Sequence, residues 1–240
     1  MNPEKALVWF RRDLRDHDHA ALSTTLNNAR QVYCAFVFDT DILDALPSRQ
    51  DRRVHFIRES LLELDAALRT KGGGLIVRHG RATEEISALA RQLGVDIVYA
   101  NRDYEPAAKQ RDAAVADSLL ASGIAFQAIK DQAIFDGDEV LTQAGKPFSV
   151  FTPYKNAWYK KAALSDSDFY VRPYPVERYF DHLAISPPAN GVPTLSDLGF
   201  EPTDLAKIGV VPGMAGGRQR VEDFFTRIDH YKTARDFPAI

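Results

Sequence analysis

The chain has 240 residues, of which 45% are hydrophobic and 26% charged, and these values are typical of a globular protein. Its formal net charge of −3 argues against binding to nucleic acid through a strong overall positive field. The single cysteine, Cys34, excludes an intrachain disulfide, and no apolar run reaches the roughly 18 residues of a transmembrane helix. The first residues also lack the pattern of a signal peptide, so we expect a cytoplasmic protein without a membrane partner.

Apolar and amphipathic segments alternate over the first 130 residues. The run QVYCAFVFD at 31–39 is apolar almost throughout, as strands are when a parallel sheet is covered on both faces. Between 52 and 70, apolar residues recur at spacings of three and four, which is the pattern of an amphipathic helix. The sequence predicts strands at 5–10, 31–38, 74–78, 96–101 and 124–129, and helices at 18–29, 52–70, 83–93 and 105–120.

This alternation predicts the fold class α/β, with a doubly wound, five-stranded parallel sheet and helices on both of its faces. We expect the Rossmann-like strand order 3-2-1-4-5, with the flavodoxin-like order 2-1-3-4-5 as the alternative. In either order the strands end along one edge of the sheet, which is where such folds bind ligands.

The pattern changes after residue 130. One further helix is predicted at 152–163, and the periodicity then fades over 164–217, where seven of the 13 prolines lie. A last amphipathic helix is predicted from Arg218 to Arg235. The sequence therefore indicates an α/β domain at 1–130, a long connection at 131–217 and, at 218–240, the first helix of a truncated helical domain.

A dense charge cluster follows the first predicted strand. Leu7–Phe10 runs directly into RRDLRDHDH at 11–19, at the edge where ligands are expected. Asp103 and Glu105 follow the fourth strand and should reach the same edge. These residues could bind a polar ligand, but a solvated loop and acids that favour a helix N-terminus are the alternatives.

Several common sites are missing from the sequence. No G-x-G-x-x-G follows the first strand, and there is no phosphate-binding P-loop, which argues against a nicotinamide dehydrogenase and a P-loop nucleotidase. No Ser-His-Asp arrangement can be assigned. His17 and His19 alternate with acids, but this spacing is unspecific, so we expect no metal.

The segment WFRRDLRDHDHAAL at 9–22 resembles the N-terminal signature of the DNA photolyase/cryptochrome family, with His19 in place of the usual Asn. Three further segments resemble the family in the same order, namely NRDYEP at 101–106, GKPFSVFTPYKNAW at 145–158 and YKTARDFPAI at 231–240. The resemblance implies an α/β domain that holds an antenna chromophore and a helical domain that holds FAD. The chain is similar to the N-terminal portion of a class I photolyase, a light-dependent lyase that splits cyclobutane pyrimidine dimers. A cryptochrome-type blue-light receptor and a stand-alone flavin- or nucleotide-binding module are the alternatives.

The resemblance also implies where an antenna chromophore would bind. The walls of the pocket would come from Asp39 after the second strand, from Arg53 and Phe56 in the long helix, and from Asp103 and Glu105. The carboxylates would accept hydrogen bonds from ring N–H or ribityl hydroxyl groups, and Arg53 would pair with an anionic tail. Phe56 would stack on the ring system, although an ordinary core role is the alternative.

The same resemblance separates the possible cofactors. Ala107 and Ala108 stand where folate-binding members offer an Asn-Glu pair, so a deazaflavin or a flavin is expected rather than methenyltetrahydrofolate. Tyr231 would contact FAD phosphates and Arg235 would contact damaged DNA. The remaining FAD-binding residues and all catalytic residues would lie beyond Ile240. We therefore expect this chain alone to be inactive, and the full-length protein to be a monomer that binds damaged DNA and no metal.

Overall fold

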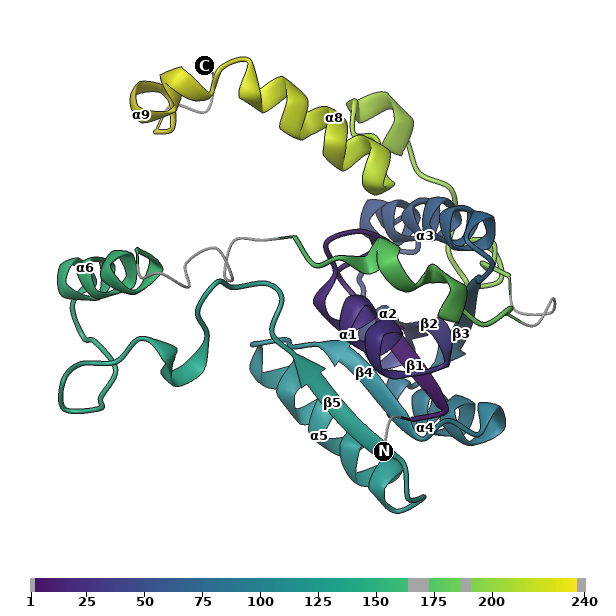
Figure 1. Cartoon of the computed structure of the whole chain (residues 1–240). Helices are drawn as coiled ribbons and strands as arrows, with labels where there is room; N and C mark the ends of the chain where they lie inside the picture. The colour runs from purple at the N-terminus through teal and green to yellow at the C-terminus, as the bar shows by residue number, and fades with distance from the viewer. Residues whose placement is uncertain (1–2, 164–172, 187–190, 237–240) are drawn as a thin grey trace.

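The computed structural model describes residues 3–163, 173–186 and 191–236, and it contains one five-stranded parallel sheet (Figure 1). The strands run in the order β3-β2-β1-β4-β5, which confirms the Rossmann-like topology over the flavodoxin-like one. Their bounds are β1 (Lys5–Phe10), β2 (Gln31–Asp39), β3 (Leu75–Gly80), β4 (Ile97–Asn101) and β5 (Ala125–Ile129). All four pairs of neighbouring strands are parallel, so every strand ends at the same edge.

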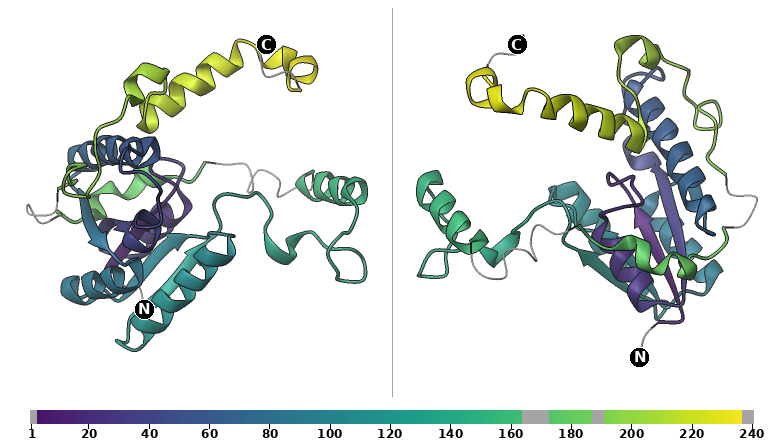
Figure 2. Two further views of the ribbon diagram at one scale, coloured as in Figure 1. Left: turned by 180° about the vertical axis from the view of Figure 1, so that it is seen from behind. Right: turned by 45° about the horizontal axis from the view of Figure 1, so that its top comes forward.

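Helices cover both faces of the sheet, as predicted (Figures 1 and 2). One face packs against α1 (Ala20–Asn28) and α3 (Arg52–Thr70), and the other packs against α4 (Ala82–Leu93) and α5 (Pro106–Leu120). Successive side chains of β1 alternate between the two faces. Val8 and Phe10 point toward α1 and α3, whereas Leu7 and Trp9 point toward α4 and α5. This double burial explains why β1 is apolar from Ala6 to Phe10.

The amphipathic pattern of α3 corresponds to its packing. Leu61, Leu64 and Leu68 are fully buried against the sheet. Each such burial contributes about 1.5–3 kcal/mol, so a change to alanine in this row would cost about 2–5 kcal/mol. The helix begins where the carboxylate of Asp51 accepts the backbone N–H of Arg53 at 2.8 Å.

The connection after β5 wraps around the α/β unit. The 3-10 helix η2 (Val176–His182) packs on α1, and Leu195, Leu198 and Phe200 are buried in the core on the α1 and α3 side. By contrast, α6 (Phe151–Ala162), at the predicted place, projects away from the sheet (Figure 1). The shorter elements are α2 (Thr40–Leu43), η1 (Gly137–Glu139) and η3 (Leu205–Ile208). The proposed domain boundaries remain a prediction, and parts of the connection lie outside the described residues.

The final helix differs from the prediction at both ends. Instead of one helix over 218–235, α8 spans Gly213–Phe225 and is followed by η4 (Ile228–His230) and α9 (Tyr231–Ala234). It starts earlier because side chains of α3 supply the partners for its first N–H groups, which a glycine-rich sequence cannot reveal. It ends where both the backbone N–H and the hydroxyl of Thr226 donate to the carbonyl of Asp223, at 3.2 and 2.7 Å.

Among the helices in the described part of the chain, none is both long enough and apolar enough to cross a membrane.

Candidate functional site

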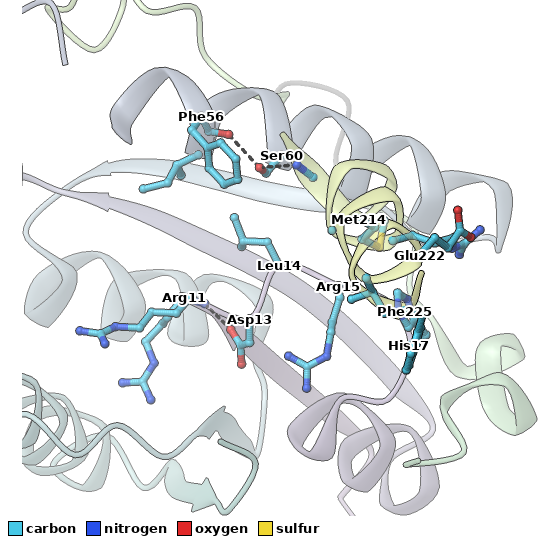
Figure 3. A pocket seen from close by; sticks show the side chains of 16 residues that line it. Arg11, Asp13, Leu14, Arg15, His17, Phe56, Ser60, Met214, Glu222 and Phe225 are labelled. Atoms are coloured by element: carbon cyan, nitrogen blue, oxygen red, sulfur yellow. Dashed lines mark hydrogen bonds between the residues drawn. The ribbon is translucent and has the colours of Figure 1, made fainter. Parts of the chain in front are cut away.

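A cavity of about 850 Å³ lies at the edge of the sheet where the strands end (Figure 3). The loop after β1 forms its floor, α3 contributes Phe56, Ile57 and Ser60, and α8 forms a further wall. The lining combines apolar side chains with four arginines and two carboxylates. Its residues are Arg11, Arg12, Asp13, Leu14, Arg15, His17, Phe56, Ile57, Ser60, Gly213, Met214, Gly217, Arg218, Val221, Glu222 and Phe225. Cavities of this size and mixed character are typical of sites for small organic ligands.

The wall formed by α8 is held in place by α3 and by the β1 loop. Ser60 Oγ accepts the N–H of Gly213 at 3.0 Å, and Glu63 Oε1 accepts the N–H of Ala215 at 2.9 Å. These two α3 side chains cap α8, which has no side-chain cap of its own. Met214 lies against the loop, where its sulfur accepts the N–H of Asp16 at 3.4 Å. The position of this wall is therefore fixed by long-range contacts.

Close approach of backbone explains one glycine of this wall. A Cβ at Gly216 would overlap the carbonyl oxygen of Val211, in the segment that leads into α8. The neighbouring Gly217 has nothing within 4 Å of a Cβ built at that position. Of these two adjacent glycines, only Gly216 is therefore required by the packing of this turn.

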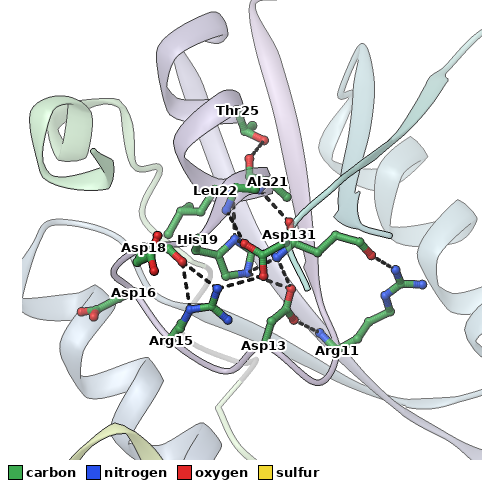
Figure 4. Close-up of polar contacts among 12 residues, drawn as sticks. Arg11, Asp13, Arg15, Asp16, Asp18, His19, Ala21, Leu22, Thr25 and Asp131 are labelled. Atoms are coloured by element: carbon green, nitrogen blue, oxygen red, sulfur yellow. Dashed lines mark hydrogen bonds and ion pairs between the residues drawn. The ribbon is translucent and has the colours of Figure 1, made fainter. Parts of the chain in front are cut away.

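The loop after β1 is organised by a buried polar cluster rather than by solvent (Figure 4). His19 is fully buried, its Nδ1 accepts the N–H of Leu22 at 3.0 Å, and its Nε2 lies 3.0 Å from Asp13 Oδ2. His19 thus caps α1 and donates to Asp13 from the opposite side of its ring. Asn101, at the end of β4, donates to Asp13 and accepts the N–H of Ala21 at 2.8 Å. The alternative of a solvated charged loop is therefore wrong for these residues.

The environment of Asp13 favours its ionised form. Burial raises the pKa of the Asp13 carboxyl, but hydrogen bonds from His19 and from the backbone N–H of Arg11 outweigh burial, so the pKa lies well below its ordinary value. A charged Asp13 therefore holds the loop against the start of α1.

Two of the arginines of the loop have structural partners. Arg11 forms an ion pair with Asp112 at 2.6 Å, also donates to the carbonyl of Asn101, and lies 4.9 Å from the ring centre of Trp9. Arg15 pairs with Asp131 at 2.8 Å. These contacts join the end of β1 to α5 and to the segment after β5.

Arg12 makes a different contact, because it joins the cavity to both acids predicted after β4. Its Nη2 lies 2.8 Å from Glu105 Oε2, and its Nε lies 3.4 Å from Asp103 Oδ2. The hydrogen bond that Arg12 donates to Glu105 is the main cause of the raised pKa of Arg12. Asp103 is buried and also accepts the N–H of Tyr104 at 2.8 Å. The structure therefore brings Asp103 and Glu105 to the predicted edge, where Arg12 pairs with both.

Of the other three residues expected at an antenna pocket, only one lines the main cavity. Phe56 lines the cavity, as expected. Arg53 pairs with Asp51 at 2.6 Å and lines a separate depression of about 670 Å³ beside 202–204. Asp39 is buried, where it accepts the N–H groups of Asp41 and Ala82, both at 3.2 Å. Neither Asp39 nor Arg53 lines the main cavity.

The two residues expected to contact FAD and DNA lie at the far end of the chain. Tyr231 is exposed on α9, with its ring 5.9 Å from that of Phe224. Arg235 is exposed and lies 3.7 Å from Asp236. Figure 1 shows α9 beyond the end of α8, away from the sheet, and neither residue lines the cavity.

Sequence reasoning placed Arg12 in the charge cluster at the expected ligand edge, but it did not identify Ser60, Met214 and Arg218 as lining residues. These three depend on how α8 docks, for which the sequence has no local signal. Within 3–163, 173–186 and 191–236, no group of three or more His, Cys, Asp or Glu residues is arranged to hold a metal ion.

Comparison with known proteins gives one consistent family. Residues 6–175 match the DNA photolyase family. The chain is 30% identical over 243 aligned positions to a deoxyribodipyrimidine photo-lyase of Synechococcus sp., covering 97% of this chain and 48% of that protein. It is 31% identical to a cryptochrome DASH of Natronomonas pharaonis, with coverage of 97% and 50%. The chain thus spans about half the length of the curated relatives it matches.

Two solved structures have the same fold. A bacterial class III photolyase from Agrobacterium tumefaciens superposes with a TM-score of 0.73 at 24% identity, covering 100% of this chain and 48% of that one. An archaeal photolyase from Sulfolobus tokodaii, solved with two FAD molecules, gives a TM-score of 0.53 at 31% identity, covering 63% and 34%. The first likeness extends over the whole chain, α8 included.

Proposed function

Because the chain belongs to the DNA photolyase family, we propose that it is the chromophore-binding part of a light-dependent DNA repair protein. In this proposal, a chromophore in the cavity absorbs light and passes the excitation to FAD. The complete protein would use that energy to split cyclobutane pyrimidine dimers in damaged DNA. Its activity would be that of a carbon–carbon lyase, which half of the relatives' length is not expected to perform alone.

The single observation that carries the proposal is the cavity at the edge of the sheet. Its volume of about 850 Å³ suits a ring system of several fused rings. Phe56, Ile57 and Phe225 offer apolar or aromatic surface to such rings, and the arginines offer cations to an anionic substituent. A surface groove that held only water would require neither aromatic walls nor arginines held in place by buried acidic side chains.

A flavin or deazaflavin is the favoured chromophore. Ala107 is exposed and Ala108 is buried, and neither can hydrogen-bond the polar groups of methenyltetrahydrofolate. The Sulfolobus tokodaii photolyase was solved with two FAD molecules, which were described as implying a novel light-harvesting cofactor. That precedent supports a flavin here.

The chain would make a small contribution to the FAD site of the complete protein. No hydrogen bond of the Tyr231 hydroxyl occurs within the described residues, so this group is available to a phosphate, as the family resemblance predicts. Arg235, whose contact with Asp236 is long and exposed, is available to a DNA phosphate. FAD, when bound, would supply the light-driven electron transfer.

Titration of the purified chain with FMN, a 5-deazaflavin and methenyltetrahydrofolate, followed by absorbance and fluorescence, tests the chromophore site. Flavin or deazaflavin binding is expected, with a shifted absorption band. Phe56→Ala should weaken binding about tenfold, because it removes one aromatic wall of the cavity. Phe151→Ala is the matched control, because Phe151 is 71% exposed on α6, away from the cavity.

Two results would contradict the assignment. Tight binding of the folate alone would overturn the choice of chromophore. Equal losses of flavin binding in the Phe56 and Phe151 variants would show that the flavin binds elsewhere.

A cryptochrome-type photoreceptor is the second candidate, because the cryptochrome DASH relative is as similar as the photo-lyase relative. The same chromophore site would then serve signalling instead of repair. The discriminating measurement is light-dependent loss of pyrimidine dimers from single-stranded and duplex DNA by the complete protein. Loss from duplex DNA supports the photolyase, and no loss from either substrate supports the photoreceptor.

A further inference from the structure

The arginines that line the cavity differ in their exposure and in their ion pairs. The side chain of Arg11 is 8% exposed and paired with Asp112, and Arg15 is paired with Asp131. These two side chains hold the loop in place. Arg12 is paired with Asp103 and Glu105, but its side chain is 54% exposed. Arg218 forms no ion pair within the described part of the chain. Arg12 and Arg218 are therefore the cations that a ligand could engage.

Arg12 also controls the two acids behind it. Its guanidinium lies between Asp103 and Glu105, at 3.4 and 2.8 Å from their carboxylates. Neither acid lines the cavity, but Arg12 does. A ligand at this wall therefore meets a cation instead of two anions. Without Arg12, the same wall would carry two uncompensated carboxylates, which would repel an anion.

The charges of the opposite elements support the same ligand class. From α8, Arg218 and Glu222 both line the cavity, one turn apart. From the loop, Asp13 is engaged by His19 and His17 lies 3.2 Å from Asp16. The lining has four arginines and two carboxylates, but Arg11 and Arg15 are held by buried or half-buried acids. The cations that favour an anionic group there are therefore the exposed Arg12 and Arg218, which is unpaired within the described residues.

Building on the proposed flavin site, we infer that Arg12 determines ligand specificity by selecting a flavin with a phosphate over the same flavin without one. The phosphate lies at the Arg12 wall, with Arg218 as a second cation. Guanidinium groups suit phosphate because their N–H donors match its oxygens in pairs. This role differs from the one that the sequence suggested for Arg53, which does not line the cavity.

The experiment compares FMN with riboflavin, which share the isoalloxazine ring and ribityl chain and differ by one phosphate. Dissociation constants are measured by flavin fluorescence for the 240-residue chain and three variants. The unaltered chain should bind FMN at least about tenfold more tightly than riboflavin, and Arg12→Gln should reduce this ratio to less than about threefold. Arg218→Gln should reduce it partly.

Arg52→Gln is the matched control. Arg52 has nearly the same exposure as Arg12, at 53% against 54%, and pairs with Asp204 at 2.7 Å, but it does not line the main cavity. The preference of the Arg52→Gln variant for FMN over riboflavin should equal that of the unaltered chain. Far-ultraviolet circular dichroism and thermal midpoints verify that every variant is folded. Added salt should weaken FMN binding to the unaltered chain more than riboflavin binding.

Each outcome has a distinct meaning. Equal affinity for FMN and riboflavin in the unaltered chain would overturn the inference and leave the proposed flavin site in place. A ratio that survives Arg12→Gln, or that falls equally in the Arg52 control, would also overturn it. Binding of neither flavin would refute both the proposed chromophore site and this inference.

Discussion

Substitution of Gly216 by alanine should detach the wall of the cavity that α8 forms. A Cβ at this position overlaps the carbonyl oxygen of Val211, so either that segment or the helix must move. Overpacking of this kind costs about 1–3 kcal/mol. Gly217→Ala is the control, because it adds the same methyl group to the same helix with nothing within 4 Å. In that position alanine should stabilise the helix by about 0.5–1 kcal/mol.

The two variants should therefore differ by about 1.5–4 kcal/mol in the local stability of α8. Hydrogen–deuterium exchange of peptides covering 213–225 measures this directly, because α8 can open without unfolding the sheet. Gly216→Ala should speed exchange there and leave β1, β2 and β4 unchanged. Protection of α8 in Gly216→Ala equal to that in Gly217→Ala would refute the packing argument.

Four further outcomes are expected. His19→Ala should lower the free energy of unfolding by about 2–4 kcal/mol in urea denaturation, because it removes the α1 cap and one of the buried donors of Asp13. A loss below about 1 kcal/mol would contradict this. The pKa of Asp13 is depressed in the folded state, so the stabilisation from its ionised form is present above the ordinary carboxyl pKa of about 4 and is lost as the pH falls below it. In Asp13→Asn, the free energy of unfolding should therefore fall less between about pH 4 and pH 2 than in the unaltered chain. Trp158→Phe leaves Trp9 as the only tryptophan, and a flavin bound beside the β1 loop should quench the fluorescence of Trp9. Unchanged Trp9 emission at saturating flavin would place the flavin elsewhere. Phe225, 63% exposed, lies with Phe224 and Ile228 in an exposed apolar stripe, which we expect to drive self-association. Phe225→Ser should therefore lower the apparent mass in light scattering, unless the unaltered chain is already monomeric.

The sheet could be predicted from the sequence because its signals are local. Apolar runs such as 31–39 and the repeated leucines of α3 have the periods of their elements, and short connections leave few topologies. The observed strand order was the expected one, but these signals and the preference for right-handed crossovers left the flavodoxin-like order open. The last helix was predicted to be amphipathic, and its apolar residues Phe224, Phe225 and Ile228 are exposed.

The candidate site was only partly predictable, because partners far apart in sequence decide it. Arg53 and Arg12 both have acidic neighbours in the chain, but Arg53 folds back onto Asp51, whereas Arg12 reaches across the sheet edge to Glu105. Sequence spacing cannot distinguish these outcomes. Likewise, the glycines before Arg218 suggested the end of a connection, whereas they form the first turns of α8. Packing against α3 overrides their low helix propensity.

One wall of the cavity comes from α8, which lies outside the residues that match the family. That match covers 6–175, whereas α8 begins at Gly213. An excised chromophore module that stopped at residue 175 would retain the sheet and the β1 loop but would lose the wall with Arg218 and Phe225. A ligand in this cavity would contact both the β1 loop near the beginning of the chain and α8 near its end, and would hold them together. Adding the ligand should therefore make the 213–225 segment resistant to proteases, and a minimal photosensory module for transfer to other proteins would have to include α8.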